Sequence, residues 1–447
     1  MWIMNEKIIR NMSSLAVTEP GKKILDAVEE TMGRLDPSRI VRDFLSFFSE
    51  GDIPEDVRII GFGKASAKMM AGALEVLRKP VYAGIIIPNG MEQPDLPRGV
   101  QLLRGSHPIL DSSSIESTRK VLSNMKELNE ASVAIVLISG GGSALFELPV
   151  EGISVQDFAS VSKCVMNSGG SIQELNGIRY TMSQVKGGKL ARFLYPARVT
   201  ALIISDVPGD DISVIASGPL VPPDMPENAL RENLERFSAL CPDLARVKEK
   251  LDLNLPESYD GIFRKVQNRI ILKNSDFVDS IANILREDGS VVRVLYEPVT
   301  GDVHKVSEFF VETARTMYAD LHRPFFLVAG GETTVTVHGN GIGGRNCQLS
   351  VMVSTLFSRD EEFAFASLGT DGIDGVSPAM GGITDSVFRN RVTEKEVEAS
   401  LDKNDTFTLL NKYMSAIISG FTGNNVSDIF ICYYAGNSAP PGDGNKL

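Results

Sequence analysis

Cysteine and histidine are scarce in this chain. Its four cysteines are far apart with no CxxC spacing, and none of its four histidines forms an HExxH pair. Both absences argue against a zinc site, and we expect no disulfide framework. Free thiols are the default of a reducing compartment, so the sequence favours a cytoplasmic location. The cysteines are Cys164, Cys241, Cys347 and Cys432.

Basic residues are outnumbered by acidic ones, and long apolar runs are absent. Lys and Arg number 45 against 57 Asp and Glu, a formal net charge of −12. Broad binding to nucleic acid or to an anionic membrane needs a basic face, so we expect neither partner. No apolar run approaches the length that spans a bilayer. A small anionic ligand held by one or two local cations is still compatible with this charge.

The chain has 447 residues, 43% of them hydrophobic, which is enough for two domains with ordinary cores. Short apolar runs alternate with helical patterns, which predicts an α/β fold with a largely parallel sheet covered on both faces. Expected helices include 65–78, 113–128, 275–287 and 306–321. Expected strands are 57–60, 83–87, 133–138, 199–204, 269–272, 291–296, 325–328, 333–337 and 363–367.

The proline-rich and polar stretch between residues 221 and 268 marks the expected domain boundary. We therefore expect an N-terminal α/β domain over residues 1–250 and a C-terminal α/β domain over residues 265–436. The last residues, 437–447, are rich in Gly, Pro and Asn and read as a disordered tail.

Five of the apolar runs lead into glycine loops that also contain polar residues. In open α/β sheets, ligands bind outside the carboxyl ends of the strands, where glycine lets backbone N–H groups approach a phosphate. Any single loop could be an ordinary turn, but six polar glycine loops in one chain favour a phosphate site. The loops are 61–66, 139–143, 205–211, 329–334 and 369–375, with 421–428 preceding the final apolar run.

The two cations in these loops are the leading candidates for binding an anion. No segment matches the P-loop pattern, and residues 61–66 resemble GxGxxG only superficially. Lys64 lies at a strand-to-helix junction and is suited to bind a phosphoryl oxygen. The alternative is a solvated lysine, but the helix dipole disfavours an unpaired positive charge in the first turn of a helix. Arg345 follows a glycine run and suits bidentate binding of phosphate or carboxylate, the alternative being an exposed hairpin arginine.

Several carboxylates in the loops could bind Mg²⁺, which prefers oxygen ligands. For Asp211, capping a helix is the favoured role, and Asp374 could form a turn. His107 precedes Pro108 and is expected to order a turn. The metal candidates are Asp206, Asp210 and Asp371.

These loops, in this order, resemble the glycerate 2-kinase family, whose C-terminal part is the MOFRL domain. The resemblance extends from about residue 27 to residue 434. Its segments are GFGKAS, SGGGSALFELP, SDVPGDD followed by ASGP, GGETTVTV, GGRN, GTDGIDG and TGNNVSD. The sequence departs from the usual family pattern at Tyr180, at Cys347 and in the segment 300–303. The resemblance therefore does not fix the detailed substrate specificity.

The resemblance implies transfer of the γ-phosphoryl group of ATP to the 2-hydroxyl of D-glycerate, with Mg²⁺. It also implies a Rossmann-like three-layer N-terminal domain, a smaller α/β MOFRL domain and an active site in an interdomain cleft. The motif match also implies that Lys64, Asp206 and Arg345 occupy the proposed catalytic and substrate-binding positions of the family.

Further residues are assigned to binding of substrate or nucleotide. The triglycine loop is expected to cradle a phosphate or the glycerate carboxylate, and assembly as a homodimer is left open. Competing hypotheses are an NAD(P)H-dependent hydroxypyruvate reductase, a kinase of a related hydroxy acid, and a non-catalytic nucleotide sensor. The binding residues are Gly63, Ser139, Gly140, Gly141, Gly142, Ser143, Asn176, Arg179, Glu332, Thr370 and Asp371.

Overall fold

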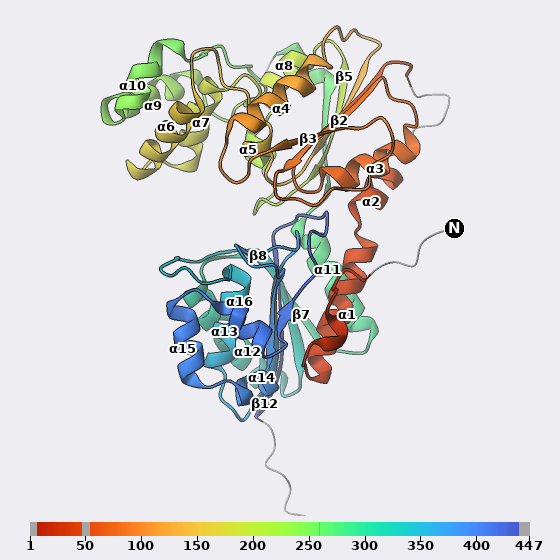
Figure 1. Ribbon diagram of the computed structural model, residues 1–447, viewed down its shortest axis with the longest axis vertical. Coiled ribbons are helices and arrows are strands. Elements are labelled where there is room, and N and C mark those ends of the chain that lie inside the picture. Colours follow the sequence, from red (N-terminus) through yellow and green to blue (C-terminus); the bar gives the residue numbers. More distant parts are fainter. Residues whose placement is uncertain (1–6, 47–53, 259, 438–447) are drawn as a thin grey trace, which may run out of the picture. The chain divides into compact units, whose positions relative to one another are not determined.

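The computed structural model describes residues 7–46, 54–258 and 260–437. The chain forms two compact units (Figure 1). Residues 37–272 form the central unit, and the residues up to 36 together with those from 273 onward form the terminal unit. Residues 438–447 of the expected tail lie outside the described residues.

The limits of the two units differ from the expected domains 1–250 and 265–436. Helix α1 (Glu19–Arg34) packs against α11 (Asn274–Glu287), and Lys23 of α1 forms an ion pair with Asp288. The N-terminal segment therefore belongs to the unit formed by the C-terminal part of the chain. Conversely, strand β6 (Val266–Leu272) pairs with β5 (Arg198–Ile204) and completes the sheet of the central unit.

The central unit is built on a six-stranded, fully parallel sheet in the order β3-β2-β1-β4-β5-β6. This is the strand order of doubly wound dinucleotide-binding sheets. Strands such as β4, with the sequence VAIVLI, are buried almost throughout, as expected where helices cover both faces. The remaining strands are β1 (Val57–Phe62), β2 (Tyr82–Pro88), β3 (Gln101–Gly105) and β4 (Val133–Ile138).

Four helices of the central unit, α6, α7, α9 and α10, pack around their own apolar core, to the left of the sheet in Figure 1. Phe158, Ile178 and Phe237 are among its buried residues. The helices of this unit are α2 (Pro37–Leu45), α3 (Ser66–Val76), α4 (Ser112–Ser123), α5 (Gly142–Leu145), α6 (Val155–Asn167), α7 (Ile172–Met182), α8 (Lys189–Leu194), α9 (Glu227–Leu240) and α10 (Pro242–Val247), with 3-10 turns η2 (Ile215–Ser217), η3 (Lys248–Lys250) and η4 (Gly261–Lys265).

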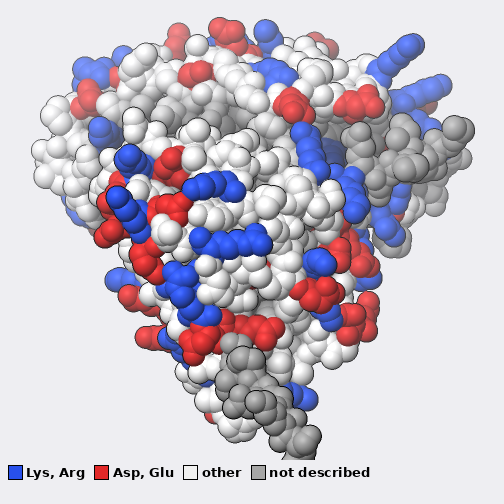
Figure 2. Space-filling model, turned by 60° about the horizontal axis from the view of Figure 1, so that its bottom comes forward, with Lys and Arg blue, Asp and Glu red and all other residues white. Residues whose placement is uncertain are grey.

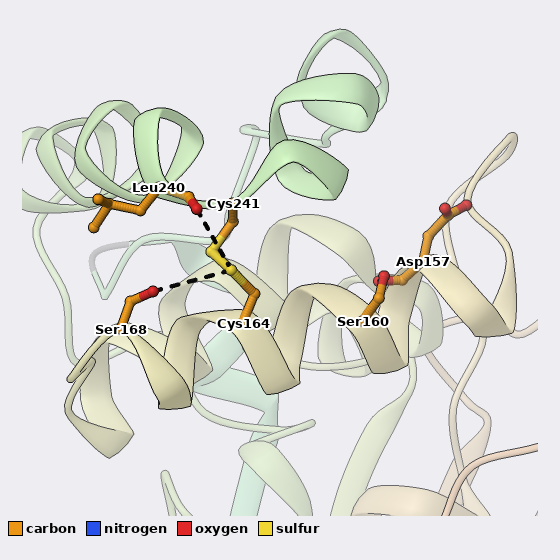
Figure 3. Close-up of a disulfide and its surroundings, with 6 residues drawn as sticks. All are labelled: Asp157, Ser160, Cys164, Ser168, Leu240 and Cys241. Carbon is orange, nitrogen blue, oxygen red and sulfur yellow. Dashed lines mark hydrogen bonds between the residues drawn. A yellow bond between two sulfur atoms is a disulfide. The ribbon is translucent and has the colours of Figure 1, made fainter.

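A disulfide joins Cys164 of α6 to Cys241, which lies between α9 and α10 (Figure 3). The expectation that the chain has no disulfide is therefore wrong. The two cysteines are 77 residues apart in sequence, and spacing alone cannot show that the junction of α9 and α10 lies against α6. Cys347 and Cys432 are buried as free thiols.

The terminal unit contains a mixed six-stranded sheet in the order β11-β10-β9-β12-β8-β7. Only β7 and β8 pair in parallel, so the expectation of a largely parallel sheet is wrong for this unit. The reason is β12, which returns antiparallel between β8 and β9. The strands are β7 (Val292–Asp302), β8 (Phe325–Thr334), β9 (Glu361–Gly369), β10 (Gly381–Asp385), β11 (Ala416–Ile417) and β12 (Asp428–Asn437).

Helices cover both faces of this second sheet, with α1 and α11 on one side and α12 and α13 on the other (Figure 1). Phe310, Phe365 and Phe430 meet in its core. The expected strand 333–337 is wrong, because residues 333 and 334 extend β8 and no strand follows directly. The helices are η1 (Met12–Ser14), α1, α11, α12 (Val303–Leu321), α13 (Arg345–Leu356), α14 (Ser386–Arg391), α15 (Glu394–Asp402) and α16 (Thr406–Lys412).

The expected α/β fold class is confirmed, with two sheets and helices against both. Among the described residues, no helix has the length and apolar character needed to cross a bilayer. On the face shown in Figure 2, Lys and Arg side chains are interspersed with Asp and Glu side chains.

Candidate functional site: two clusters of glycine loops

In the central unit, the loops that follow β1 and β4 lie against each other. The Lys64 N–H donates to the Gly140 carbonyl oxygen at 3.0 Å, and the Ala65 N–H donates to Ser139 Oγ at 3.0 Å. Gly63 has a φ of +118°, and a Cβ atom there would lie 2.3 Å from Ser139 Oγ. Only glycine permits this close approach, which places Lys64 beside the triglycine loop at the carboxyl ends of two parallel strands.

The triglycine loop leads into the short helix α5. Among the described residues, no hydrogen-bond acceptor is found for the backbone N–H groups of Gly140, Gly141, Gly142 and Ser143. Such a run of unpaired N–H groups is typical of a concave anion-binding backbone. The Ser143 and Ser217 hydroxyl oxygens are 3.0 Å apart, so this loop also contacts the ASGP segment. The geometry therefore suits a small oxyanion.

His107 lies against the same loop. A Cβ atom on Gly141 would be 2.9 Å from the Cδ2 atom of His107. The sequence indicated only a turn-ordering role for this histidine, whereas the structure brings its ring to the predicted anion site.

The predicted site residues of α7 are largely buried. Asn176 is 7% exposed, and Arg179 Nε donates to Ser162 Oγ of α6 at 3.1 Å. Burial lowers the pKa of Arg179, and the carboxylate of Glu147 opposes this effect. Glu147 lies just past α5, the short helix that begins in the triglycine loop, so Arg179 is electrostatically coupled to that segment.

Lys186 is a buried cation next to the triglycine loop that sequence reasoning missed. It is 1% exposed, and its Nζ atom donates to the carbonyl oxygens of Gly142 and Ala216. The flanking pattern VKGGK offered a weak signal, because lysine beside glycine is usually a surface turn.

The loop after β5 contains three of the predicted carboxylates. Asp206 is half-buried directly after the strand, and Asp210 has a φ of +56°. Asp211 accepts hydrogen bonds from the Ser213 N–H and hydroxyl groups, so it holds a turn ahead of η2. The N-cap residue of η2 itself is Val214, so helix capping by Asp211 is not confirmed. Among the described residues, no group of three His, Cys, Asp or Glu side chains is arranged to hold a metal ion.

In the terminal unit, three glycine loops meet at one edge of the sheet. Asp428, the first residue of β12, pairs in register with Gly331 of β8 and with Gly369 of β9. Because β12 is antiparallel to both neighbours, its amino end meets their carboxyl ends. The GGETT, GTDGIDG and TGNNVSD segments therefore lie together.

Arg345, the first residue of α13, reaches into this edge. Its Nε and Nη2 atoms donate to the two carboxylate oxygens of Asp428 at 2.7 and 3.0 Å, and its Nη1 atom donates to Glu332 at 2.7 Å. The side chain is 32% exposed. Although burial lowers the pKa of Arg345, the two carboxylates outweigh burial and raise it. The alternative prediction, that Arg345 is an exposed arginine in a hairpin, is therefore wrong.

Two buried aspartates hold the start of α13, and sequence reasoning did not assign either to the site. Asp374 accepts from the Asn346 and Cys347 N–H groups at 3.1 and 2.7 Å, so it is a helix-capping acceptor rather than only a turn former. Burial raises the pKa of Asp374, and it raises that of Asp428 to about 6 against the effect of Arg345.

Thr370 and Asp371 fix the GTDGIDG loop to its neighbour. The Thr370 hydroxyl donates to the Ser427 carbonyl oxygen and accepts from the Val426 N–H, both at 2.8 Å. Asp371 accepts from the Ile373 N–H at 3.2 Å. Thr370 is fully buried, so it supports the loop, whereas the half-buried Asp371 is a better candidate for contacting a ligand.

The predicted site residues thus divide into two sets by unit, called the central and the terminal cluster. The central unit contains Gly63, Lys64, the triglycine loop, Asn176, Arg179, Asp206 and Asp210. The terminal unit contains Glu332, Arg345, Thr370 and Asp371. The sharing of one ligand by Lys64 and Arg345 stays a prediction.

Comparison with known proteins finds matches over both parts of the chain. Residues 23–250 match the family model described as a domain of unknown function, DUF4147, and residues 325–428 match the MOFRL family. The chain is 41% identical to a glycerate 2-kinase of Picrophilus torridus over 96% of this chain and 99% of that protein. It is 32% identical to a putative hydroxypyruvate reductase of Agrobacterium vitis over 83% and 97%.

The structure is similar to the crystal structure of a glycerate kinase from Thermotoga maritima, with a TM-score of 0.80 and 29% identity. The similarity covers 93% of this chain and 99% of that one. By its sequence and its structure, the chain belongs to the MOFRL-type glycerate 2-kinase family.

Proposed function

We propose that this enzyme transfers the γ-phosphoryl group of ATP to the 2-hydroxyl of D-glycerate and forms 2-phosphoglycerate. Family membership supports the reaction class. The observation that most directly supports it in this chain is the run of unpaired N–H groups of the triglycine loop beside Lys64. Phosphoryl transfer depends mainly on positioning and on neutralising charge, which such groups provide.

The central unit supplies the groups proposed to act on the transferring phosphoryl group. Lys64 adds a compact positive charge next to the N–H groups of the triglycine loop. Asp206 follows β5 in the same parallel sheet, and we assign it to orienting the 2-hydroxyl of glycerate. Both residues come from the carboxyl ends of strands, where ligands bind in such sheets.

The terminal unit supplies Arg345, which we assign to the glycerate carboxylate or to charge on the transferring group. Asp428 and Glu332 take three of the five guanidinium N–H donors in the described part of the chain. Two donors are left, enough for a bidentate contact to an oxyanion. The carboxylate of Asp428 fixes the plane of the guanidinium, so little rotamer entropy remains to be lost on binding.

Mg²⁺ would be held by Asp206 and Asp210, with Asp371 as a further candidate. Mg²⁺ usually binds proteins through one or two carboxylates and keeps water and phosphate oxygens as its other ligands. A loop with two aspartates therefore fits Mg²⁺ without a cage of three protein ligands. When bound, the ion would neutralise charge on the phosphates of ATP.

The test is to incubate the purified protein with ATP, Mg²⁺ and D-glycerate and to locate the phosphate by ³¹P NMR. We expect 2-phosphoglycerate. Formation of 3-phosphoglycerate would overturn the assignment of the 2-hydroxyl, and ATP binding without turnover would indicate a nucleotide sensor. A related hydroxy-acid substrate would be revealed by a higher kcat/KM than that for D-glycerate.

Reduction of hydroxypyruvate with NAD(P)H is the second candidate, because the central sheet has the strand order of dinucleotide-binding folds. In such folds an acidic residue near the end of the second strand binds the ribose. Here β2 ends at Pro88 and is followed by Asn89, so that carboxylate is missing from the strand end. Oxidation of NADH by hydroxypyruvate at a rate similar to the kinase rate would favour this candidate.

We also propose that the enzyme works in the cytoplasm, where its proposed donor ATP is available. The Cys164–Cys241 disulfide is compatible with this location in organisms whose intracellular proteins keep disulfides. Cell fractionation followed by thiol labelling would test both points.

A further inference from the structure

The ammonium group of Lys186, in the segment between α7 and α8, is buried beneath the triglycine loop. Its Nζ atom donates to the Gly142 carbonyl oxygen at 3.0 Å and to the Ala216 carbonyl oxygen at 2.9 Å. Gly142 begins α5 in the triglycine loop, and Ala216 belongs to the ASGP segment. One buried cation therefore joins two loops of the proposed site.

The bond to Gly142 bears on the direction of one loop N–H group, and the Phe146 N–H donates to the same oxygen at 3.1 Å. In a planar trans peptide, the carbonyl oxygen and the following N–H point in opposite directions. Because the Gly142 oxygen faces Lys186 in the interior, the Ser143 N–H faces away from it, and this N–H has no acceptor among the described residues. The bond from Lys186 thus helps to turn the Ser143 N–H away from the interior.

Neighbouring bonds hold Lys186 in place. The Gly187 N–H donates to the Ser217 carbonyl oxygen at 3.1 Å, and the Gly188 N–H donates to the Gly218 carbonyl oxygen at 2.8 Å. The segment of Lys186 is therefore fixed to the ASGP segment by its backbone as well as by its ammonium group.

The charge of Lys186 is balanced by Glu147, which is also fully buried. Glu147 accepts hydrogen bonds from the Ser183 hydroxyl and the Leu148 N–H. Burial lowers the pKa of Lys186, and Arg179 lowers it further, whereas Glu147 raises it. A buried charge is costly unless it is paired. A buried lysine beneath a glycine loop is therefore a candidate for a function at that loop.

We propose that Lys186 is a positioning residue for oxyanion binding. Its ammonium group orients the Gly142–Ser143 peptide, whose N–H then faces the ligand, and adds positive potential beneath the bound oxyanion. The inference rests on the proposed function for the identity of that oxyanion, which is a phosphate of ATP or the carboxylate of D-glycerate.

The test compares Lys186→Met/Glu147→Gln with Lys189→Met. The double variant removes one positive and one negative charge, so the net buried charge does not change and Glu147 is not left without its partner. Lys189 is a matched control because it is also buried and its Nζ atom also binds carbonyl oxygens, those of Tyr180 and Ser183, but it does not contact the glycine loops. Isothermal titration calorimetry with ATP and, separately, with D-glycerate measures binding without turnover.

We expect the double variant to bind one of the two ligands at least about tenfold more weakly, equivalent to about 1.4 kcal/mol. The ligand whose affinity falls is the one bound by the loop. Lys189→Met should lower thermal stability but keep both affinities. Unchanged affinities in the double variant, with the fold verified by circular dichroism, would overturn the proposal.

A second measurement uses the wild-type protein and so does not depend on the folding of a variant. If the charge of Lys186 supports binding, affinity for the ligand of the triglycine loop should fall as pH rises and Lys186 loses its proton. This fall should occur below the pH range in which an ordinary lysine titrates, because burial lowers the pKa of Lys186. The charged groups that face Lys186 are Glu147 and Arg179. Constant affinity through that range would contradict the proposal. If the wild type binds ATP but forms no 2-phosphoglycerate, the proposed function fails while this inference is still tested.

Discussion

At the scale of single residues, Lys64 is the sharpest test of the central cluster. We predict that Lys64→Met lowers kcat by about two orders of magnitude or more, as losses of comparable charge-stabilising groups do. The side chain is only half-buried, so folding should be intact. Steady-state kinetics with D-glycerate measures the loss, and Lys120→Met, a surface lysine of α4, is the control. Normal turnover by Lys64→Met would rule out the assigned role.

Asp428 should make the activity depend on pH. Burial raises the pKa of Asp428 from 3.8 to about 6, so this carboxylate takes up a proton as pH falls through about 6. Protonation removes one of the charges that fix Arg345, and we predict that kcat/KM falls on the acid side of pH 6.

The pH profile of Asp428→Asn is the matched comparison. The amide keeps the shape of the side chain but has no charge to lose, so its kcat/KM should be low at neutral pH and should lack the acid limb near pH 6. An unchanged acid limb in this variant would assign that pKa to another group. Thermal unfolding of both proteins over the same pH range separates an effect on activity from loss of fold.

At the scale of elements, the contact between the β1 and β4 loops can be tested through Gly63. A Cβ atom at this position would meet Ser139 Oγ at 2.3 Å in a backbone with φ of +118°, so Gly63→Ala should cost more than about 1 kcal/mol and lower kcat. Gly99 has a similar φ of +94° but open space around it, so Gly99→Ala measures the conformational cost alone. Equal effects of the two variants in urea unfolding would show that the loops do not need this contact.

We predict that the disulfide stabilises the helical group of the central unit. Closing a loop of 77 residues restricts the unfolded chain, so reduction should lower the free energy of unfolding by about 2–4 kcal/mol. Urea unfolding with and without reductant measures this loss. The variant Cys164→Ser/Cys241→Ser should match the reduced wild type and should not respond to reductant. Equal stability of oxidised and reduced protein would contradict the prediction.

Sequence reasoning found the elements whose signals are local. Glycine and aspartate after apolar runs identified the loops of Lys64, Asp206 and Asp371, because a strand followed by a glycine turn is a short-range pattern. The loop 421–428 was identified, but Asp428 was not assigned to the site, because it stands at the amino end of its strand and only the antiparallel return of β12 brings it to the carboxyl ends of β8 and β9. Lys186 and the disulfide were missed for the same reason, since both depend on tertiary contacts.

At the scale of the whole molecule, the two units contribute one cation each to the proposed reaction. The chain passes between the units twice, after Asp36 and after Leu272, and each unit has its own core. Each cluster is assembled inside its own unit, and neither alone contains both Lys64 and Arg345. The proposed kinase activity therefore requires that both clusters act on the same pair of substrates.

A double-mutant cycle tests this requirement without any assumption about geometry. If Lys64 and Arg345 stabilise one transition state, removing either disrupts the same arrangement, and the loss of kcat/KM in Lys64→Met/Arg345→Ala should be well below the product of the two single losses. Groups that act at independent sites would instead give losses that multiply. Because Arg345→Ala leaves Asp428 and Glu332 without their cation, Arg345→Lys is the companion variant that keeps the charge but loses the bidentate contact. Its cycle with Lys64→Met should show the same non-additivity, and multiplicative losses in both cycles would refute the shared action of the two clusters.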